Sequence, residues 1–405
     1  MPILSTYRLA VNLIRVAALS PLLCFPSSTF AKQQTFPRFE LEAVISHLDH
    51  PWALEAIGDA EFLVTTKPGQ LLLIQQDQVQ TWIKGVPEVL NQGQGGLMDI
   101  ELHPDYKTNG WIYLSYAYAE NGHNATRILR AHIHNNELVD QQIIFTASPL
   151  KDTYVHYGAR MVFLPDNSLI ISVGDGFDYR EDAQRLDSQL GKLIRIKDDG
   201  SLPDNNPRFE EPEANPFIWS YGHRNPQGLY YDKQRKILFE HEHGPAGGDE
   251  INLIQPGKNY GWPVITKGKD YSGAMISPYQ TYPGMEQPFI DWTPSIAPSS
   301  MLVYRGEMFK EINGDLLVTT LKTRELRWLK MQGNKVVQQK SLLRYLNERL
   351  RDIKIDAQGA IYILTDGEQA KLLKVTRRKT AKDTETTGQP AAKDAEKSPS
   401  ALNSA

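Results

Sequence analysis

The chain has one cysteine, little net charge and no apolar run long enough to cross a membrane. The cysteine is Cys24, and the formal net charge over 405 residues is -4. No intramolecular disulfide can therefore form, and the weakly acidic balance argues against a surface that binds nucleic acid. The hydrophobic fraction of 40% and the aromatic fraction of 9% are those of a globular protein rather than a disordered one. A chain of this length buries a substantial core without metals or disulfides.

Residues 1–31 have the pattern of an export signal. Arg8 and Arg15 flank the first part, an apolar run follows over residues 16–26, and a small-residue end reaches Ala31. The run is shorter than the about 20 residues that span a bilayer, so we expect a cleaved signal peptide (1–31), with a membrane anchor as the alternative. Leu23 disfavours a lipoprotein through Cys24. The mature chain would contain no cysteine, and we expect it in the bacterial periplasm.

The chain ends in a polar segment. Residues 377–405 are rich in Lys, Thr, Ala, Glu and Ser and show no apolar periodicity. Such a segment buries too little surface to offset the entropy lost on ordering. We therefore expect a disordered tail outside the fold.

Between residues 40 and 376 the sequence has a slow internal repeat. Short apolar strands recur at intervals of 45 to 79 residues, and long helical patterns are scarce. The strands cover residues 61–66, 111–116, 168–173, 236–241, 315–320 and 360–365. Repeats of this kind predict an all-β fold, a six-bladed β-propeller with four-stranded blades. A β-sandwich is the alternative, but it rarely extends over so many residues as one unit.

A propeller brings distant loops to one rim of a central channel, and sites commonly lie on such loops. The richest segment is 154–160, which contains His156 and Arg160. The strand at 168–173 follows and delivers Asp175. A base, an orienting acid and a cation for an anionic ligand are thus expected in one pocket.

Three further segments have the composition of a site. Residues 92–98 are rich in glycine, so their backbone can approach a ligand closely, and residues 221–229 contain a guanidinium and two amides. Residues 242–250 offer carbonyl and carboxylate oxygens that suit Ca²⁺, although the spacing is not that of an EF-hand. A simple turn is the alternative for residues 92–98, whereas a surface turn would not need as many planar polar groups as residues 221–229 contain.

A cationic group completes these motifs. It consists of Lys322, Arg324, Arg349 and Arg351. Arg349 and Arg351 occupy alternate positions of an extended segment and would point to one face. Two like charges there require an anion or acids, unless the face is solvated.

Together these motifs resemble the soluble dehydrogenases of the glucose and sorbosone dehydrogenase-like family that depend on pyrroloquinoline quinone (PQQ), most of all the aldose sugar dehydrogenases. The resemblance covers residues 43–376. Several spaced motifs in one order are far more specific than any one of them. The matching segments are 93–97, 156–160, 222–228, 242–245, 249–252, 259–263, 295–299 and 349–352. The resemblance implies a six-bladed propeller, in agreement with the strand count.

The resemblance also implies roles for individual residues. His156 would be the catalytic base that takes the proton of the sugar C1 hydroxyl while hydride moves to the quinone, and Asp175 would orient its imidazole. Arg224 would stabilise negative charge on the quinone oxygens. The three carboxylates of PQQ would provide the anion that the cationic group needs. The implied cofactor contacts are Gln94, Arg224, Asn225, Ser295, Lys322, Arg349 and Arg351.

Calcium is implied at two places. The carbonyls of Gly244 and Pro245 match ligands of an ion that touches the cofactor and acts as a Lewis acid. Glu250 and Tyr260 match a second, more structural site. Asp270 is a less secure match there, and Tyr271 is a weaker match to a cofactor contact. Ala159 departs from the family pattern, which commonly has glycine at that position.

The resemblance implies an exported PQQ- and Ca²⁺-dependent dehydrogenase, monomeric or homodimeric. It would oxidise the C1 hydroxyl of aldose sugars to lactones and pass electrons to an external acceptor. A calcium-dependent hydrolase of the lactonase type is one alternative, but it would not need Lys322, Arg349 and Arg351. A non-enzymatic ligand-binding propeller is another, but it should have lost His156 or Arg224.

Overall fold

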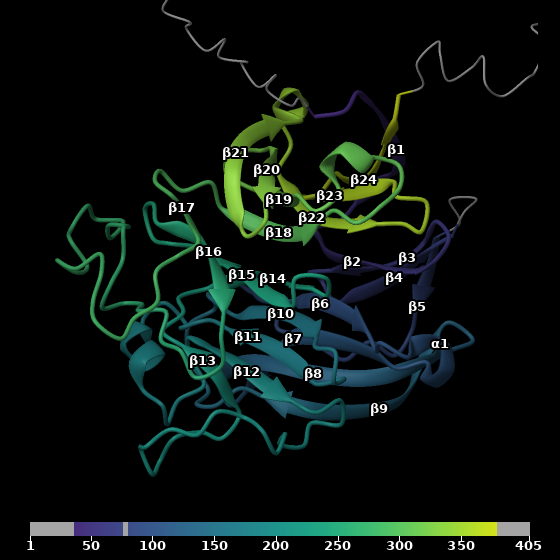
Figure 1. Ribbon diagram of the computed structural model, residues 1–405. Helices are drawn as coiled ribbons and strands as arrows, with labels where there is room; N and C mark the ends of the chain where they lie inside the picture. The colour runs from purple at the N-terminus through teal and green to yellow at the C-terminus, as the bar shows by residue number, and fades with distance from the viewer. Residues whose placement is uncertain (1–35, 76–79, 379–405) are drawn as a thin grey trace, which may run out of the picture. The chain divides into compact units, whose positions relative to one another are not determined.

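The computed structural model describes residues 36–75 and 80–378 (Figure 1). The expected signal peptide and residues 379–405 of the expected tail lie outside these ranges. The described residues form six four-stranded antiparallel sheets. No helix among them is long and apolar enough to cross a membrane.

Each sheet is one blade. The first contains β2 (Pro51–Gly58), β3 (Glu61–Thr66), β4 (Gln70–Ile74) and β5 (Gln80–Ile83), and the second contains β6 (Leu97–Leu102), β7 (Ile112–Glu120), β8 (His123–His134) and β9 (Glu137–Thr146). The third contains β10 (Gly158–Phe163), β11 (Leu169–Val173), β12 (Lys192–Ile196) and β13 (Ile218–Tyr221), and the fourth contains β14 (Pro226–Asp232), β15 (Ile237–Glu242), β16 (Asp249–Ile254) and β17 (Ile290–Trp292). The fifth contains β18 (Pro298–Val303), β19 (Leu316–Thr320), β20 (Leu326–Gln332) and β21 (Lys335–Leu342). The sixth contains β22 (Leu350–Ile355), β23 (Ile361–Thr365), β24 (Ala370–Arg377) and β1 (Phe39–Leu48).

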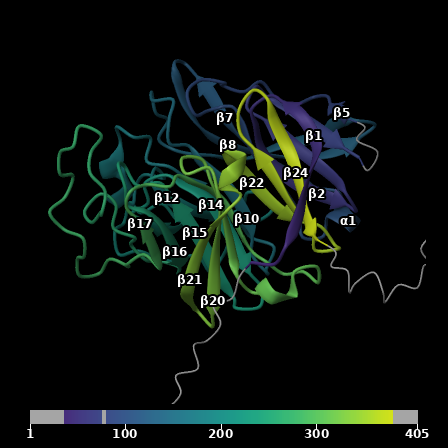
Figure 2. The ribbon, with the colours of Figure 1, turned by 90° about the horizontal axis from the view of Figure 1, so that it is seen from above.

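The blades close into a ring. The first strand of each blade contacts the first strand of the next, in the order β2, β6, β10, β14, β18, β22 and back to β2. Figure 2 shows the same blades from above. The last blade takes its outer strand, β1, from the N-terminal side of the domain and pairs it with β24. The predicted six-bladed β-propeller with four-stranded blades is confirmed.

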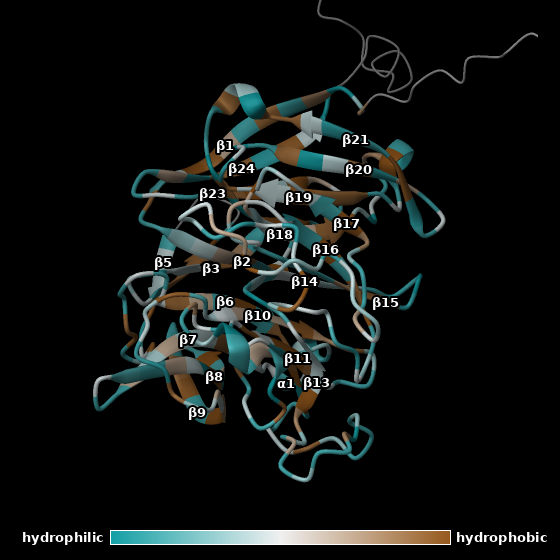
Figure 3. Cartoon of the chain, turned by 90° about the vertical axis from the view of Figure 1, so that its left-hand side faces the viewer, coloured by the Kyte–Doolittle hydropathy of each residue, from teal (hydrophilic) through white to brown (hydrophobic). Residues whose placement is uncertain are grey.

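Burial explains which strands the sequence reveals. The six predicted strands fall on β3, β7, β11, β15, β19 and β23, the second strand of every blade. All residues of β11, β19 and β23 are buried, because each blade packs against a neighbour on both faces, and such strands read as continuous apolar runs. Outer strands such as β21 alternate between exposed and half-buried residues. Polar colouring accordingly follows most connecting loops in Figure 3.

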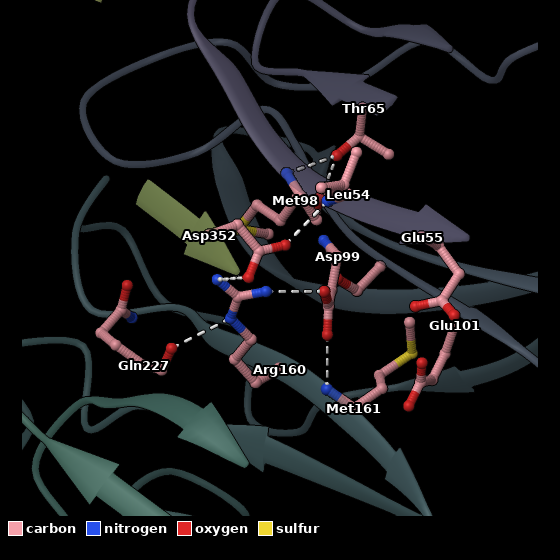
Figure 4. Close-up of polar contacts among 12 residues, drawn as sticks. Leu54, Glu55, Thr65, Met98, Asp99, Glu101, Arg160, Met161, Gln227 and Asp352 are labelled. Carbon is pink, nitrogen blue, oxygen red and sulfur yellow. Dashed lines mark hydrogen bonds and ion pairs between the residues drawn. The ribbon is translucent and has the colours of Figure 1, made fainter. Parts of the chain in front are cut away.

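The inner strands carry charged residues into the central channel. Arg160 on β10 donates from Nη1 to Asp99 Oδ1 at 2.9 Å and from Nε to the carbonyl of Gln227 at 2.9 Å (Figure 4). Its Nη2 lies 3.5 Å from Asp352 Oδ1. These contacts join four inner strands, and removing one partner of a buried network of this kind typically costs about 3–5 kcal/mol.

Two cavities lie along this channel. One, of about 610 Å³, is lined by residues toward the C-terminal ends of the inner strands, including Glu101, Phe163 and Lys354. The other, of about 330 Å³, is lined by residues at or before their N-terminal ends, including Gly158 and Arg351. Of the predicted site residues, Gln94, Asn225, Arg349 and Arg351 line the second cavity.

Candidate active site

His156 and Asp175 form a buried hydrogen-bonded pair. His156 precedes β10, Asp175 follows β11, and β10 pairs with β11 in an antiparallel hairpin that brings the two residues together. Nδ1 of the imidazole lies 2.7 Å from Oδ1 of the carboxylate, and the side chains are 6% and 1% exposed. Within the described ranges, no residue hydrogen-bonds to Nε2 of His156. The second ring nitrogen is thus available to take a proton from a bound molecule.

The carboxylate of Asp175 is fixed by three donors. Oδ1 accepts the backbone N–H of Phe177 at 2.8 Å in addition to the imidazole, and Oδ2 accepts Nε1–H of Trp262 at 2.8 Å. A carboxylate held in this way fixes the tautomer and the orientation of its histidine. Burial lowers the pKa of His156 below its usual 6.5, while Asp175 acts in the opposite direction. The imidazole is therefore neutral at pH 7 and able to act as a base.

The backbone around His156 has an unusual conformation. His156 has φ 51°, and Gly158 and Ala159 have φ 66° and 72°. Such left-handed angles cost about 1–3 kcal/mol for a non-glycine residue and are found mainly where the surroundings enforce them. The backbone N–H of His156 donates to Gln94 Oε1 at 2.9 Å. A Cβ atom at Gly174 would lie 2.2 Å from the carbonyl oxygen of His156, so only glycine fits there.

The cavity of about 330 Å³ is rich in cations. Lys67, Arg349 and Arg351 line it together with Gln94, Asn225 and Asp366. Burial, and then the charge of Arg351, lower the pKa of Lys67. Against these three cations the same wall offers one carboxylate, Asp366. The cavity is thus suited to an anion.

Asp366 joins the two arginines. Nε of Arg349 donates to Asp366 Oδ2 at 2.6 Å, and Nε and Nη2 of Arg351 donate to Oδ1 at 3.0 and 2.8 Å. Both guanidinium groups therefore lie on one face, as their alternate spacing predicts. The sequence shows Asp366 after the last predicted strand, but it does not show that this acid pairs with both arginines.

Arg224 and Asn225 are buried between the third and fourth blades. Nη1 of Arg224 donates to the carbonyls of His243 and Gly244 at 2.9 and 3.0 Å. The side-chain oxygen of Asn225 accepts the backbone N–H of Gly158 at 3.3 Å. This places Asn225 against the cavity wall beside the His156 loop.

Three of the four predicted calcium ligands line a small cavity of about 20 Å³. Gly244, Glu250 and Tyr260 line it together with Glu242. Burial and the charge of Glu242 raise the pKa of Glu250 to about 8. The hydroxyl of Tyr260 donates to the carbonyl of Leu253 at 2.8 Å and accepts the backbone N–H of Gln255, so the hydroxyl is already engaged.

The remaining predicted metal and cofactor residues lie outside these cavities or at their edge. Pro245 lines a third cavity of about 270 Å³. Ser295 donates its hydroxyl to Asp249 Oδ2 at 2.7 Å, and Asp249 Oδ1 accepts the backbone N–H of Gly244. Ser295 therefore supports the loop of Gly244 and does not line the cationic cavity. Lys322 is exposed and does not line it either. Their cofactor contacts remain predictions.

Three aromatic residues complete the site. Phe177 packs edge-on against His156 at 5.2 Å between ring centroids, and Tyr271 stacks on Phe177 at 6.3 Å. Both line the third cavity together with Trp262 and Arg224. Trp262 belongs to a segment singled out in the sequence, but its contact with Asp175 has no sequence signal. For Phe177 the only signal is its place two residues after Asp175.

Known sugar dehydrogenases are similar to this chain over most of its length. A family model described as "Glucose / Sorbosone dehydrogenase" matches residues 48–374. Aldose sugar dehydrogenase YliI of Escherichia coli strain K12 is 37% identical over 367 residues, covering 89% of this chain and 98% of that protein. Quinoprotein glucose dehydrogenase B of Acinetobacter calcoaceticus is 27% identical over 445 residues, covering 88% and 91%. The structure of the soluble aldose sugar dehydrogenase from Escherichia coli in the apo-form matches with a TM-score of 0.81 at 36% identity, covering 84% of this chain and 100% of that chain.

Proposed function

The chain belongs to the glucose/sorbosone dehydrogenase family, and on that premise we propose that it is a PQQ- and Ca²⁺-dependent aldose dehydrogenase. It oxidises the C1 hydroxyl of an aldose to the lactone and passes the electrons to an external acceptor. The observation that carries the proposal is the buried His156–Asp175 pair, 2.7 Å apart, beside a cavity lined by Lys67, Arg349 and Arg351. The His156–Asp175 pair is suited to taking a proton, and the cations of the cavity are suited to holding a polyanion.

His156 acts as the base. Its Nδ1 is bound to Asp175, so Nε2 receives the proton of the C1 hydroxyl. Because Asp175 is itself fixed by Phe177 and Trp262, the ring keeps its orientation as it becomes charged. General-base catalysis of this kind typically contributes about 10²- to 10⁴-fold.

The cavity residues fit PQQ. Lys67, Arg349 and Arg351 exceed the single carboxylate of Asp366, and charge-assisted bonds to carboxylates are among the stronger ones available to a guanidinium. Gln94 and Asn225 offer amides in the same cavity. When bound, PQQ supplies the two-electron acceptor. Arg224 lines the small cavity and the third cavity, and its charge would stabilise negative charge that develops on a quinone oxygen.

The small cavity fits Ca²⁺. Glu242 and Glu250 line it, and both carboxyls have a pKa raised to about 8 by burial and by neighbouring carboxylates. Hard oxygen donors in such a place are the ligands Ca²⁺ prefers. Glu250 and the carbonyl of Tyr260 would hold one ion there. The carbonyls of Gly244 and Pro245 would hold a second at the cofactor, although Gly244 now accepts a bond from Arg224, which would have to shift.

We also infer that the protein is exported to the periplasm, from the expected signal over residues 1–31. That segment lies outside the described residues, so the inference depends on the sequence pattern. The N-terminal sequence of the mature protein recovered from a periplasmic extract tests it. A start near residue 32 is expected, and an intact Met1 would contradict it.

Reconstitution tests the activity. The protein is purified without cofactor, PQQ and CaCl₂ are added, and dye reduction is followed with glucose and a panel of other aldoses. Activity that requires PQQ, Ca²⁺ and sugar together is expected. Hydrolysis of a lactone without PQQ would favour the hydrolase, and sugar binding without turnover would favour the binding module.

A further inference from the structure

A cluster of buried polar side chains lies on one face of the fourth blade, next to the small cavity. Glu240 and Glu242 occupy alternate positions of β15 and therefore point to the same face of the sheet. His223, from the segment that joins β13 to β14, completes the cluster. One possible ligand atom from each of the three lies within 4.8 Å of the others. The three residues are 0 to 3% exposed.

In Glu240 the protein holds one oxygen and leaves the other without a partner, whereas both oxygens of Glu242 have contacts. Glu240 Oε2 accepts Nδ2–H of Asn252 at 2.9 Å, and Glu242 Oε2 accepts the backbone N–H of Arg224. Glu242 Oε1 lies 3.3 Å from Nδ1 of His223. Glu240 Oε1 is fully buried and has no hydrogen-bond partner in the described part of the chain. Outer partners that orient one atom of a carboxylate while its other atom stays free are typical of metal ligands.

Among the residues that the structure describes, no cation pairs with Glu240. The charged groups that act on this carboxylate are Glu242 and Glu250, which carry the same sign. The nearby Arg224 directs its guanidinium to the carbonyls of His243 and Gly244. A buried carboxylate is strongly unfavourable unless it is paired, protonated or bound to a metal. A cation between the three side chains satisfies both the free oxygen and the charge.

We propose that Glu240, Glu242 and His223 bind a divalent cation. Ligands at about 2.0–2.5 Å from such an ion are separated by at most about 4–5 Å, as these atoms are. Carboxylate oxygens suit Ca²⁺ and Mn²⁺, and an imidazole nitrogen suits Mn²⁺ and Zn²⁺. The ion joins β15 to the segment that carries Arg224. This cation site goes beyond the proposed function, because neither of the two proposed calcium sites uses Glu240 or His223.

Counting bound metal tests this. Protein treated with EDTA and free of PQQ is dialysed against Ca²⁺, Mn²⁺ or Zn²⁺, and the ions per chain are measured by mass spectrometry. The variants are Glu240→Gln, Glu250→Gln and the double variant. Glu325→Gln is the control, because Glu325 is a buried carboxylate of the fifth blade that already pairs with Arg327. With at least one of the three metals, Glu240→Gln should bind one ion fewer per chain than the wild type. The double variant should bind one ion fewer than Glu250→Gln, and the control should bind as many ions as the wild type.

Two outcomes overturn the proposal. Glu240→Gln that binds as many ions as the wild type with all three metals would mean that the carboxyl holds a proton. If each single variant and the double variant all bind one ion fewer than the wild type, Glu240 and Glu250 belong to one shared site, and the proposed separate site does not exist. Should Glu240→Gln not fold, Glu240→Met takes its place with the same expectation. PQQ is absent from the count, so failure of the proposed function leaves this result standing, and the reverse also holds.

Discussion

Substitution of Gly174 by alanine should displace His156, the proposed base, without removing any functional group. The new Cβ would lie 2.2 Å from the carbonyl oxygen of His156, 2.6 Å from its carbonyl carbon and 3.1 Å from Oδ1 of Asn225. Ordinary contact begins near 3.4 Å, so the His156 backbone must move by about 1 Å. A shift of this size at a reacting group costs about 10²-fold in rate. The forced packing should lower the free energy of unfolding by about 1–3 kcal/mol.

The assay separates chemistry from folding and binding. kcat is measured at saturating PQQ, Ca²⁺ and sugar, PQQ affinity is measured by titration, and the melting temperature is measured without cofactor. Gly58→Ala is the control, because its nearest atom is the flexible carboxylate of Glu61 at 2.8 Å, which can swing aside. The expected result is a kcat lower by about 10²-fold with PQQ bound within a few-fold of the wild type. A stable Gly174→Ala with wild-type kcat would refute the assigned position of His156 in the reaction.

Three further predictions follow from the site. His156→Ala should leave PQQ affinity nearly unchanged and reduce kcat by about 10²-fold or more; loss of PQQ binding with full turnover per bound PQQ would contradict the role. The wild-type rate should remain high below pH 6.5, because burial lowers the pKa of His156 and the base works when neutral. Asp175→Asn removes the charge that raises this pKa, so the fall of the rate on the acid side should move to still lower pH and the maximal rate should decrease. A fall of the rate at higher pH in Asp175→Asn would contradict the role of the pair. Arg351→Leu should weaken PQQ binding by about 10- to 100-fold with kcat at saturation retained, whereas the control Arg327→Leu should not change PQQ affinity.

The fold was predictable because the second strand of every blade is buried on both faces. Strands such as β11 and β19 read as unbroken apolar runs, and their number gives the number of blades. The inner strands were harder to see because they carry charges into the channel, as β22 does with Arg351 and Asp352. Outer strands such as β1 expose half of their residues, so their pattern resembles a loop.

The site was predictable where its contacts are local. His156 and Asp175 are 19 residues apart and joined by one hairpin, and the alternate spacing of Arg349 and Arg351 places them on one face. Contacts between blades gave no such signal. Ser295 turns out to hold Asp249 and Lys322 is exposed, so neither lines the cationic cavity. The resemblance gives their positions in the sequence but not their orientation in this chain.

A single-turnover experiment tests the central claim most directly. Protein loaded with PQQ and Ca²⁺ is mixed without an external acceptor with glucose, or with glucose deuterated at C1, and the reduction of PQQ is followed by its absorbance. The account predicts complete reduction with a primary isotope effect in the wild type, and reduction slower by about 10²-fold in His156→Ala. PQQ that binds but is not reduced by any aldose would contradict it.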